Sequence, residues 1–348
     1  MSLVIGNDFN NALSGTILND TIRGEGGNDT IVGGRGNDDM FGGLGNDLFF
    51  WNEGDGSDLM AGGGGVDTVN VSGASIAGEN FFLSKSNDTF LTRTDTAPIP
   101  RVNNITLQMS EIEILFVSGV EGNDRLVIGN IDNSGLQEVH FNGGSGNDLL
   151  DARNSSVRIG NFTTGVGDGG SGNDTLLGGK GFDHLVGGSG NDTVSGNDGV
   201  DIIYGTSNAG GSNIPGRGEK DLLTGGAGGD FFVLGDRKGV NNSARVFYDD
   251  GDNNFDFDAD FFFSNKDGTG DFARITDFKI GEDRIRLVGR SSDYVLHTVN
   301  GPLSGGSSAQ DMGIFKAGGF FRPQELIAVV QDVGTGLNLN DARQFQYV

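Results

Sequence analysis

Cysteine is absent from the 348 residues, and there are only five prolines. A disulfide framework, a thiolate metal site and a cysteine nucleophile are therefore excluded. Basic residues are also few, because 23 Lys and Arg stand against 48 Asp and Glu, which gives a formal net charge of −25. Such a polyanion repels phosphate backbones, so no nucleic acid partner is expected. No apolar run approaches the ~18 residues of a membrane-spanning helix, so no membrane span is expected either.

Glycine is the residue in excess, with 64 copies. Collagen does not explain this number, because proline is scarce and the glycines show no three-residue period. Simple disorder does not explain it either, since 25 Phe and 35% hydrophobic residues provide material for a core. A backbone-dominated repeat is the remaining interpretation.

The repeat has nine residues. The pattern GGxGxD occurs in full at eight places, which begin at Gly33, Gly42, Gly62, Gly143, Gly169, Gly178, Gly187 and Gly225. Six looser copies end in Asp20, Asp29, Asp58, Asp124, Asp201 and Asp221. The residue two places after the Asp is apolar in all fourteen copies. Each unit therefore predicts a six-residue turn followed by a three-residue strand with one inward apolar side chain.

Two such units make one coil of eighteen residues with a strand on each of two faces, so we expect an all-β parallel solenoid. Each coil alone buries only two apolar side chains, and stability must come from stacking. The sixth-position Asp then recurs on one edge, as in the pairs Asp20 and Asp38 or Asp174 and Asp192. Carboxylates stacked at about 4.8 Å repel one another, which indicates a cation between them. Carboxylates and open carbonyls suit Ca²⁺ better than Zn²⁺ or Mg²⁺.

The motif GGxGxDxUx, in which U is the apolar residue, resembles that of the RTX, or haemolysin-type, calcium-binding repeat family. The resemblance covers residues 6–70, 119–151 and 169–233. The resemblance implies a right-handed parallel β-roll (a β-helix solenoid) with several Ca²⁺ ions held between successive turns. It implies side-chain ligands at Asp20, Asp29, Asp38, Asp47, Asp58, Asp67, Asp174, Asp183, Asp192, Asp201, Asp221 and Asp230. It implies backbone ligands at Gly34, Gly36, Gly179, Gly181, Gly188 and Gly190. The competing interpretation of any one Asp is a cap folded back onto its own turn.

Two motif carboxylates, Asp124 and Asp148, have no partner eighteen residues away and are left out of the predicted ligand set. The spacing of twenty between Asp38 and Asp58, and between Asp47 and Asp67, predicts a small bulge.

Four regions follow from this pattern: residues 1–70 as an N-terminal roll, 71–168 as wider irregular solenoid turns, 169–233 as a second roll and 234–348 as a β-rich cap. We expect the wider turns to continue the same parallel coil, joined through Pro98 and Pro100. Residues 205–215 are expected to replace one repeat with a polar loop.

The run Asp230-Phe-Phe-Val-Leu leads into the C-terminal region and is followed there by Ile275-Thr-Asp-Phe and Asp283-Arg-Ile. These runs resemble the segment that ends many secreted RTX proteins, which the type I secretion machinery reads without cleavage. Met1–Asp8 has no basic or apolar signal-peptide region. The resemblance therefore implies export without a cleaved N-terminal signal and an extracellular or cell-surface location. The alternative is that this region only caps the solenoid.

No catalytic site is recognisable. There is no HExxH motif, and the serines of the GGSGND turns lack the last glycine of GxSxG. Arg93 and Arg101 are the best available candidates for the active site of a polysaccharide lyase or epimerase. We therefore expect a non-enzymatic structural, surface-layer or matrix protein that folds on binding Ca²⁺. Two alternatives stay open: a β-helix that binds or modifies an extracellular polysaccharide, and self-association into a homopolymer.

Overall fold

The computed structural model describes residues 1–73, 78–86, 88–95, 105–160, 167–206, 216–236, 245–248, 271–299, 310–317 and 324–348. These residues are almost entirely β-strands and turns, and one 3-10 turn, Ser291–Asp293, accompanies them. Across these ranges, no helix has the length and apolar character that crossing a membrane requires. The chain forms two compact units, Met1–Gly169 with Gly178–Gly181 and Gly170–Leu177 with Phe182–Val348.

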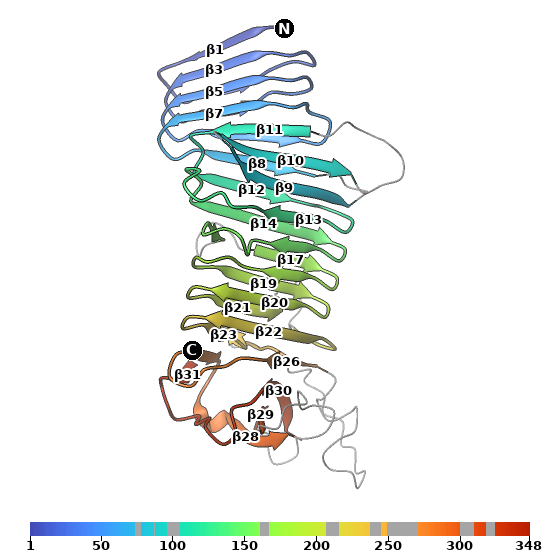
Figure 1. The fold of residues 1–348 in the computed structure, drawn as a ribbon, viewed down its shortest axis with the longest axis vertical. Helices are drawn as coiled ribbons and strands as arrows, with labels where there is room; N and C mark the ends of the chain where they lie inside the picture. Colours follow the sequence, from blue (N-terminus) through green and yellow to red (C-terminus); the bar gives the residue numbers. More distant parts are fainter. Residues whose placement is uncertain are drawn as a thin grey trace. The chain divides into compact units, whose positions relative to one another are not determined.

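The first unit begins as a two-sheet parallel coil, as the nonapeptide predicts. Strands alternate between the sheets along the sequence, so odd-numbered and even-numbered strands stack separately (Figure 1). The first sheet begins with β1 (Leu3–Asn7), β3 (Thr21–Gly26), β5 (Asp39–Leu44) and β7 (Leu59–Gly64). The second begins with β2 (Ala12–Ser14), β4 (Thr30–Val32), β6 (Leu48–Asn52) and β8 (Thr68–Ser72).

The core of this coil is built from inward side chains that stack from strand to strand, and β6 and β8 add a second buried side chain each, Trp51 and Val71. Ile22 of β3 pairs in register with Met40 of β5, and Ile31 of β4 pairs with Phe49 of β6. All four are fully buried. The apolar residue two places after each Asp is therefore a core residue, as predicted, although several strands are longer than the three residues expected.

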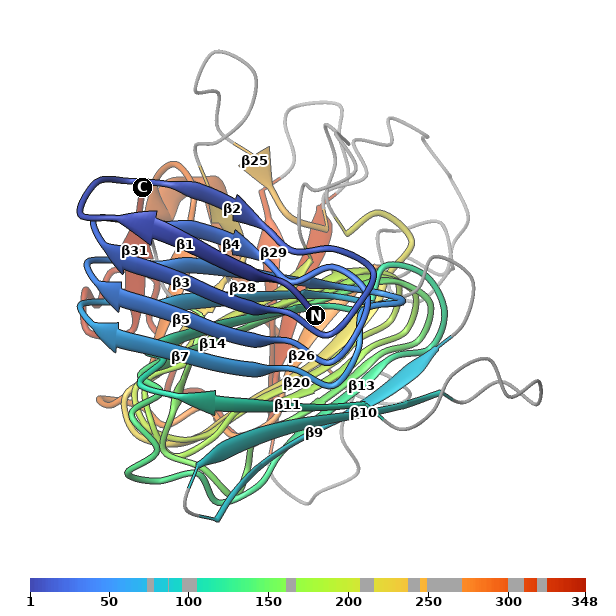
Figure 2. The same cartoon turned by 90° about the horizontal axis from the view of Figure 1, so that it is seen from above.

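The prediction of wider parallel turns after residue 70 is wrong for the next three strands. β9 (Glu79–Lys85), β10 (Thr89–Asp95) and β11 (Ile105–Ser110) form an antiparallel meander (Figure 2). The meander lies between β7 and β13 in the sheet, in the order β7-β11-β10-β9-β13. Only three residues connect β9 to β10, and a parallel neighbour needs a much longer crossover. Pro98 and Pro100 lie outside the described residues.

The parallel coil then resumes within the first unit. β13 (Arg125–Ile128) and β15 (Leu149–Asp151) extend the first sheet, while β12 (Ile114–Ser118), β14 (Glu138–Ser145) and the short β16 (Arg158–Ile159) extend the second. β17 (Gly167–Ser171) lies where the chain passes from one unit to the other.

The second unit repeats the two-sheet arrangement. One sheet runs through β18 (Thr175–Leu177), β20 (Thr193–Asp198), β22 (Lys220–Ala227) and β26 (Phe272–Ile275), and the other through β19 (His184–Ser189), β21 (Ile202–Thr206), β23 (Phe231–Val233), β27 (Arg284–Leu287) and β31 (Phe345–Tyr347). A two-residue pair, β24 (Gly235–Asp236) and β25 (Arg245–Val246), stands apart from both. Most of the polar loop predicted at 205–215 lies outside the described residues.

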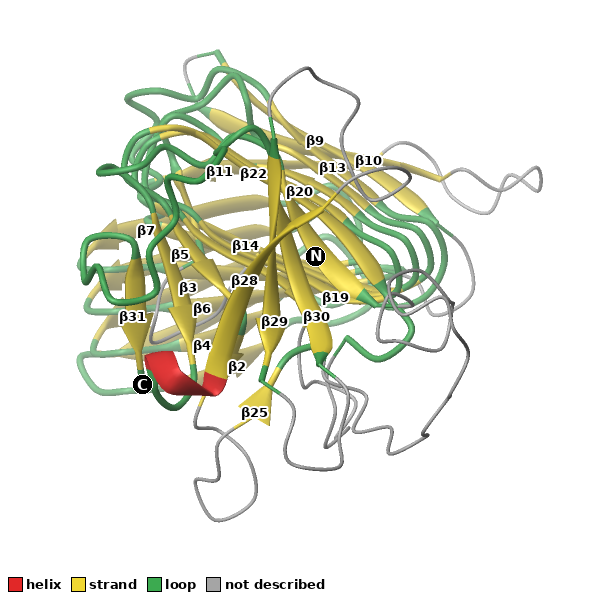
Figure 3. Cartoon of the chain, turned by 90° about the horizontal axis from the view of Figure 1, so that it is seen from below, coloured by secondary structure: helices red, strands yellow, loops and turns green. Residues whose placement is uncertain are grey.

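The C-terminal part of the second unit changes from parallel to antiparallel. β30 (Glu325–Val330) pairs parallel with β26, and β29 (Asp311–Lys316) and β28 (Tyr294–Val299) then add antiparallel strands (Figure 3). Every residue of β30 is buried. The expected β-rich C-terminal region is therefore confirmed, and its antiparallel strands end the parallel growth of that sheet.

Candidate metal sites

The sixth-position carboxylates lie inside the turns and not on the surface. All twelve predicted Asp ligands are at most 3% exposed. Each follows a glycine-rich turn and precedes the three-residue strand, so the repeat places it at the same point of every coil. A column of buried carboxylates thus runs along each edge of the roll, and we call these columns the Asp ladders.

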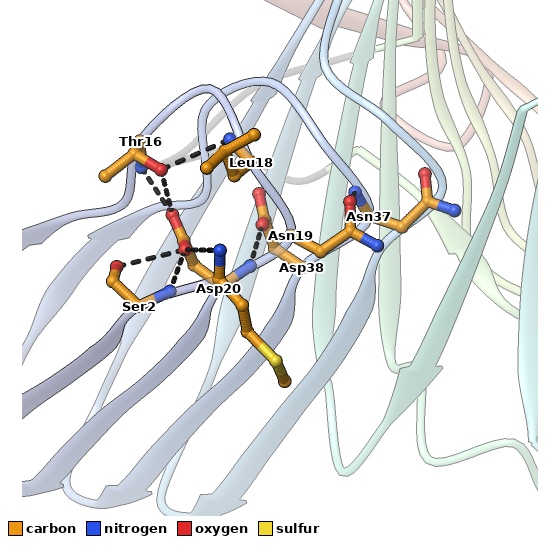
Figure 4. A network of polar contacts seen from close by, with 8 residues as sticks. Ser2, Thr16, Leu18, Asn19, Asp20, Asn37 and Asp38 are labelled. Carbon is orange, nitrogen blue, oxygen red and sulfur yellow. Dashed lines mark hydrogen bonds and ion pairs between the residues drawn. The ribbon is translucent and has the colours of Figure 1, made fainter.

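One oxygen of most ladder carboxylates is satisfied by the backbone of the preceding coil. The Asp20 N–H donates to Asp38 Oδ1 at 2.7 Å (Figure 4), and the Asp29 N–H donates to Asp47 Oδ1 at 2.8 Å. The same bond forms in the second unit, from the Asp174 N–H to Asp192 Oδ1 at 2.8 Å. This bond fixes the carboxylate plane and orients the other oxygen toward the turn.

The second oxygen, Oδ2, is buried and has no hydrogen-bond donor at most rungs. This holds for Asp29, Asp38, Asp47, Asp67, Asp124, Asp192, Asp201 and Asp230. An ionised carboxylate with an unpaired buried oxygen carries a large desolvation penalty. A repeated set of such oxygens indicates a cation as the missing partner.

The missing side chain of the first glycine leaves the space in which donor oxygens converge. A Cβ placed on Gly24 would overlap both Asp29 Oδ2 and the carbonyl oxygen of Gly42 in the next coil. A Cβ on Gly42 would overlap Asp47 Oδ2 and approach the carbonyl oxygen of Gly62 to 2.6 Å. Among the described residues, no three acidic or histidine side chains surround one point. An ion here would therefore combine carboxylate with carbonyl oxygens, and this donor set fits Ca²⁺.

The predicted backbone ligands occupy the second and fourth positions of the turn. Gly34 and Gly36 have φ of 86° and 120°, and Gly188 and Gly190 have φ of 120° and 125°, a region that glycine tolerates best. Their Cα atoms face carbonyl groups of the preceding coil. They let neighbouring turns approach closely, and ligation by their own carbonyls stays a prediction.

Gly179 and Gly181 have a different environment. A Cβ on Gly179 would lie 2.5 Å from the Ser155 carbonyl oxygen, and one on Gly181 would lie 2.8 Å from that of Ser156. At the turns of Gly24 and Gly42, the carbonyl oxygen that lies near the Asp Oδ2 atom belongs to the first glycine of the next coil. That position is absent from the predicted ligand set.

Burial raises the pKa of several ladder carboxylates. The pKa of Asp58 is raised to about 7 and that of Asp67 to about 6, in both cases chiefly by desolvation. In the second unit the pKa of Asp192 and of Asp201 rises to about 8, with desolvation the largest cause and neighbouring ladder carboxylates adding repulsion. The protein alone thus disfavours the charged ladder at neutral pH.

Asp20, a predicted ligand, is satisfied by the protein itself. Its Oδ2 accepts the Thr16 N–H at 2.7 Å and the Thr16 hydroxyl at 2.6 Å, while Ser2 donates to its Oδ1 (Figure 4). The hydrogen bond from the Thr16 side chain is the main reason that the pKa of Asp20 falls to about 2. Thr16 stands where the repeat has its second glycine, and Asp20 therefore caps its own turn. This is the interpretation that competes with calcium ligation.

Two further carboxylates receive protein donors in the second unit. The Tyr248 hydroxyl donates to Oδ2 of Asp221. Asp283 accepts the Asp230 N–H on Oδ1 at 3.0 Å and the Lys279 N–H on Oδ2 at 2.7 Å, and the Lys279 ammonium group donates to the Gly226 carbonyl. Asp283 was not predicted, although its GED sequence at 281–283 resembles the GND of the repeat.

A protein cation reaches the ladder beside the antiparallel meander. The Glu79 N–H donates to Asp124 Oδ1 at 2.6 Å, so Glu79 takes a rung. Its Oε1 accepts a hydrogen bond from Arg93 Nη2 at 2.7 Å, and Arg93 lies over the Trp51 ring at 5.7 Å. Arg93, one of the two arginines considered for a polysaccharide lyase or epimerase site, is held in this buried ion pair, and Arg101 lies outside the described residues.

Asp124 and Asp148, which were left out of the predicted ligand set, are members of an Asp ladder, and calcium ligation by them is untested. The Asp124 N–H donates to Asp148 Oδ1 at 2.7 Å, across 24 residues. Glu113 also acts as a rung, since its Oε2 accepts the Asp67 N–H at 2.8 Å. Longer coils place their additional residues outside the ladder, so a fixed spacing of eighteen misses these members.

A second ladder, of asparagines, was not predicted. The Asn37 N–H donates to Asn19 Oδ1 at 3.0 Å (Figure 4), and the Asn191 N–H donates to Asn173 Oδ1 at 2.8 Å. These bonds run from the later coil to the earlier one, opposite to the Asp bonds. The recurrent GND triplet was the available signal.

The comparison with protein families agrees with the nonapeptide repeat. The model of the RTX calcium-binding nonapeptide repeat (4 copies) matches residues 14–49, 54–72 and 168–203. No curated protein matches the chain. The chain is similar to the crystal structure of the extracellular lipase LipA from Serratia marcescens at 16% identity and a TM-score of 0.24, covering 95% of this chain and 38% of that one. The chain therefore carries RTX calcium-binding nonapeptide repeats in both of its repeat blocks.

Proposed function

We propose that this calcium-binding β-solenoid is exported in an expanded form and completes its fold outside the cell when Ca²⁺ fills the Asp ladders. The function proposed is structural, as a surface-layer or matrix component, without a catalytic step. The observation that carries the proposal is the set of buried Oδ2 atoms that have no protein donor in either unit.

Electrostatics supports coupling of calcium to folding. The chain carries a net charge of −25, and folding brings its sixth-position carboxylates into buried columns. Each ion would add two positive charges beside carboxylates whose pKa is already raised by burial, and it would bind the folded state only. Extracellular calcium modules bind at about 10⁻⁴ to 10⁻³ M, so such a ladder stays empty where free calcium is scarce.

Export by a type I machinery rests on the resemblance of the C-terminal region to RTX secretion segments. In the folded chain this region forms β28, β29 and β30, and its Val299, Leu326 and Val329 build a core with Phe272 of β26. A secretion machinery would have to read the segment before this core forms. Calcium-dependent folding would meet that requirement, because folding then waits until export is complete.

Self-association is a second candidate, favoured by the open edge of β1. Within the described residues β1 pairs with β3 alone, and its Leu3 and Ile5 are 62% and 55% exposed. An unpaired strand edge with apolar side chains favours pairing with another chain. Negative-stain microscopy with and without Ca²⁺ distinguishes a filament or lattice from single particles.

The test of the main proposal is a Ca²⁺ titration of the full chain followed by far-UV circular dichroism, with Mg²⁺ as the control ion. We expect β-sheet signal to grow cooperatively with Ca²⁺ and to respond weakly to Mg²⁺, which retains its waters and takes fewer protein oxygens. A chain that is already fully β-structured in EDTA contradicts the proposal.

A further inference from the structure

The outer face of the second sheet in the first unit carries a groove of about 520 Å³ that the calcium sites do not use. Two rows of outward side chains line it, two positions apart on β6, β8, β12 and β14. The first row is Phe50, Asn70, Phe116 and His140, and the second is Asn52, Ser72, Ser118 and Asn142. We call this feature the outer groove.

The first row offers ring faces. Phe116 and His140 stack with their centroids 4.2 Å apart and their planes within 9°. His140 is 2% exposed and also contacts Glu138, with 3.3 Å between Nε2 and Oε2, so the stack is held in place before any ligand arrives. A fixed aromatic platform gives apolar contact at little cost in side-chain entropy.

The second row offers uncharged hydrogen-bonding groups. Its amides and hydroxyls can both donate and accept, which suits a ligand dense in hydroxyl groups. Asp168 is the one charged residue among the described residues that line the groove. A carboxylate in the groove and a net charge of −25 disfavour an anionic ligand.

The length of the outer groove favours a chain-like ligand over an isolated small molecule. Three interstrand spacings from β6 to β14 extend the rows over about 14 Å. β8 and β12 are paired on both sides, so an added peptide strand would find no free backbone groups here. We infer that the outer groove binds an uncharged polysaccharide, whose pyranose rings pack against the side chains of Phe50 and Phe116 and whose hydroxyls bond to the amide and serine row.

The test measures binding by the full chain in Ca²⁺ to dextran, a galactomannan and a mixed-linkage glucan, with polygalacturonate as the charged arm. We expect at least one uncharged polymer to bind and polygalacturonate to bind more weakly. Phe116→Ala should weaken the binding about tenfold, because a stacking surface is lost. Ser118→Trp, which fills the groove without removing an aromatic ring, should also weaken it.

The matched control is Phe41→Ala. Phe41 is a half-buried aromatic residue on β5, in the same unit but in the other sheet, and Arg23 lies over its ring at 4.6 Å. Its replacement should change binding by no more than about twofold. The inference is overturned by no binding to any uncharged polymer, by equal binding of polygalacturonate, or by equal losses at Phe41 and Phe116. Circular dichroism in Ca²⁺ verifies the fold of each variant, so failure here leaves calcium-coupled folding untouched.

Discussion

The backbone N–H of Asp38 donates to Oδ1 of Asp58 at 2.8 Å, although twenty residues and not eighteen separate the two. The corresponding bond from Asp20 to Asp38 spans eighteen residues at 2.7 Å. The longer coil folds its additional residues into a local turn, in which the Asp55 N–H donates to the Asn52 carbonyl at 3.0 Å. The ladder bond is therefore kept while the length of the coil varies.

Replacing a buried ladder carboxylate should weaken calcium-dependent folding, and replacing a surface carboxylate should not. Asp47→Asn keeps an oxygen to accept the Asp29 N–H but removes the charge of a buried carboxylate whose Oδ2 has no donor. We expect the Ca²⁺ concentration at half-folding to rise roughly tenfold. The control is Asp39→Asn, one residue beyond a rung and exposed. Equal midpoints for the two variants would contradict a ligand role for Asp47.

The first glycine of the repeat should not tolerate a methyl group. Gly24→Ala places a Cβ against Asp29 Oδ2 and the Gly42 carbonyl oxygen. We expect a loss of about 1–3 kcal/mol in the free energy of unfolding, measured with denaturant in Ca²⁺. Gly26→Ala is the control on the same strand, because its nearest new contact, Asp8 Cα, is 3.4 Å away. Similar losses at both positions would mean that the space beside the first glycine has no special role.

The repeat could be predicted because its signal is local. The buried Ile22, Ile31 and Met40 each stand two residues after their Asp, and no long-range knowledge is needed to place them inside. The ladders could be predicted in part for the same reason. Glu113 was missed because its rung lies 46 residues from Asp67 and uses a longer side chain.

The donors that close individual rungs could not be predicted from spacing. Tyr248 reaches Asp221 from a segment that has no repeat, and Arg93 reaches Glu79 only because β10 runs antiparallel. Strand-forming sequence does not specify direction. The turn between β9 and β10 decides it, and its three residues were not recognised as a hairpin connection.

The ion pair of Glu79 and Arg93 should be a strong contributor to stability in the first unit. Glu79 is fully buried, so Arg93→Met leaves its charge without the guanidinium. We expect a loss of about 3–5 kcal/mol in the free energy of unfolding. Arg153→Met is the control, since the Arg153 side chain is 56% exposed in its pair with Asp151 and should cost less than about 1 kcal/mol. Denaturant unfolding in Ca²⁺ measures both, and equal costs would contradict the assignment.

Without calcium, acidification should favour the folded state. The pKa is raised from 3.8 to about 7 for Asp58 and to about 8 for Asp192 and Asp201, so the folded chain holds protons that the unfolded chain releases. The contribution of these groups is most favourable below the unfolded value of 3.8 and is lost as the pH rises through about 7 to 8.

In EDTA we therefore expect more β-sheet signal at pH 5 than at pH 8. In saturating Ca²⁺ the order should reverse, because the ion and the proton compete for the same carboxylates. Circular dichroism across this pH range measures both series. An EDTA series that gains structure as the pH rises would contradict the assignment of buried, ion-dependent carboxylates.

The most direct test of the central claim measures bound calcium and folding on the same samples. Equilibrium dialysis of the full chain against radioactive Ca²⁺, with circular dichroism of each dialysed sample, gives ions per chain and β-sheet signal together. The ladders predict that several ions bind per chain and that the signal rises in proportion to their number. A complete β-sheet signal in samples that hold no calcium would contradict the account.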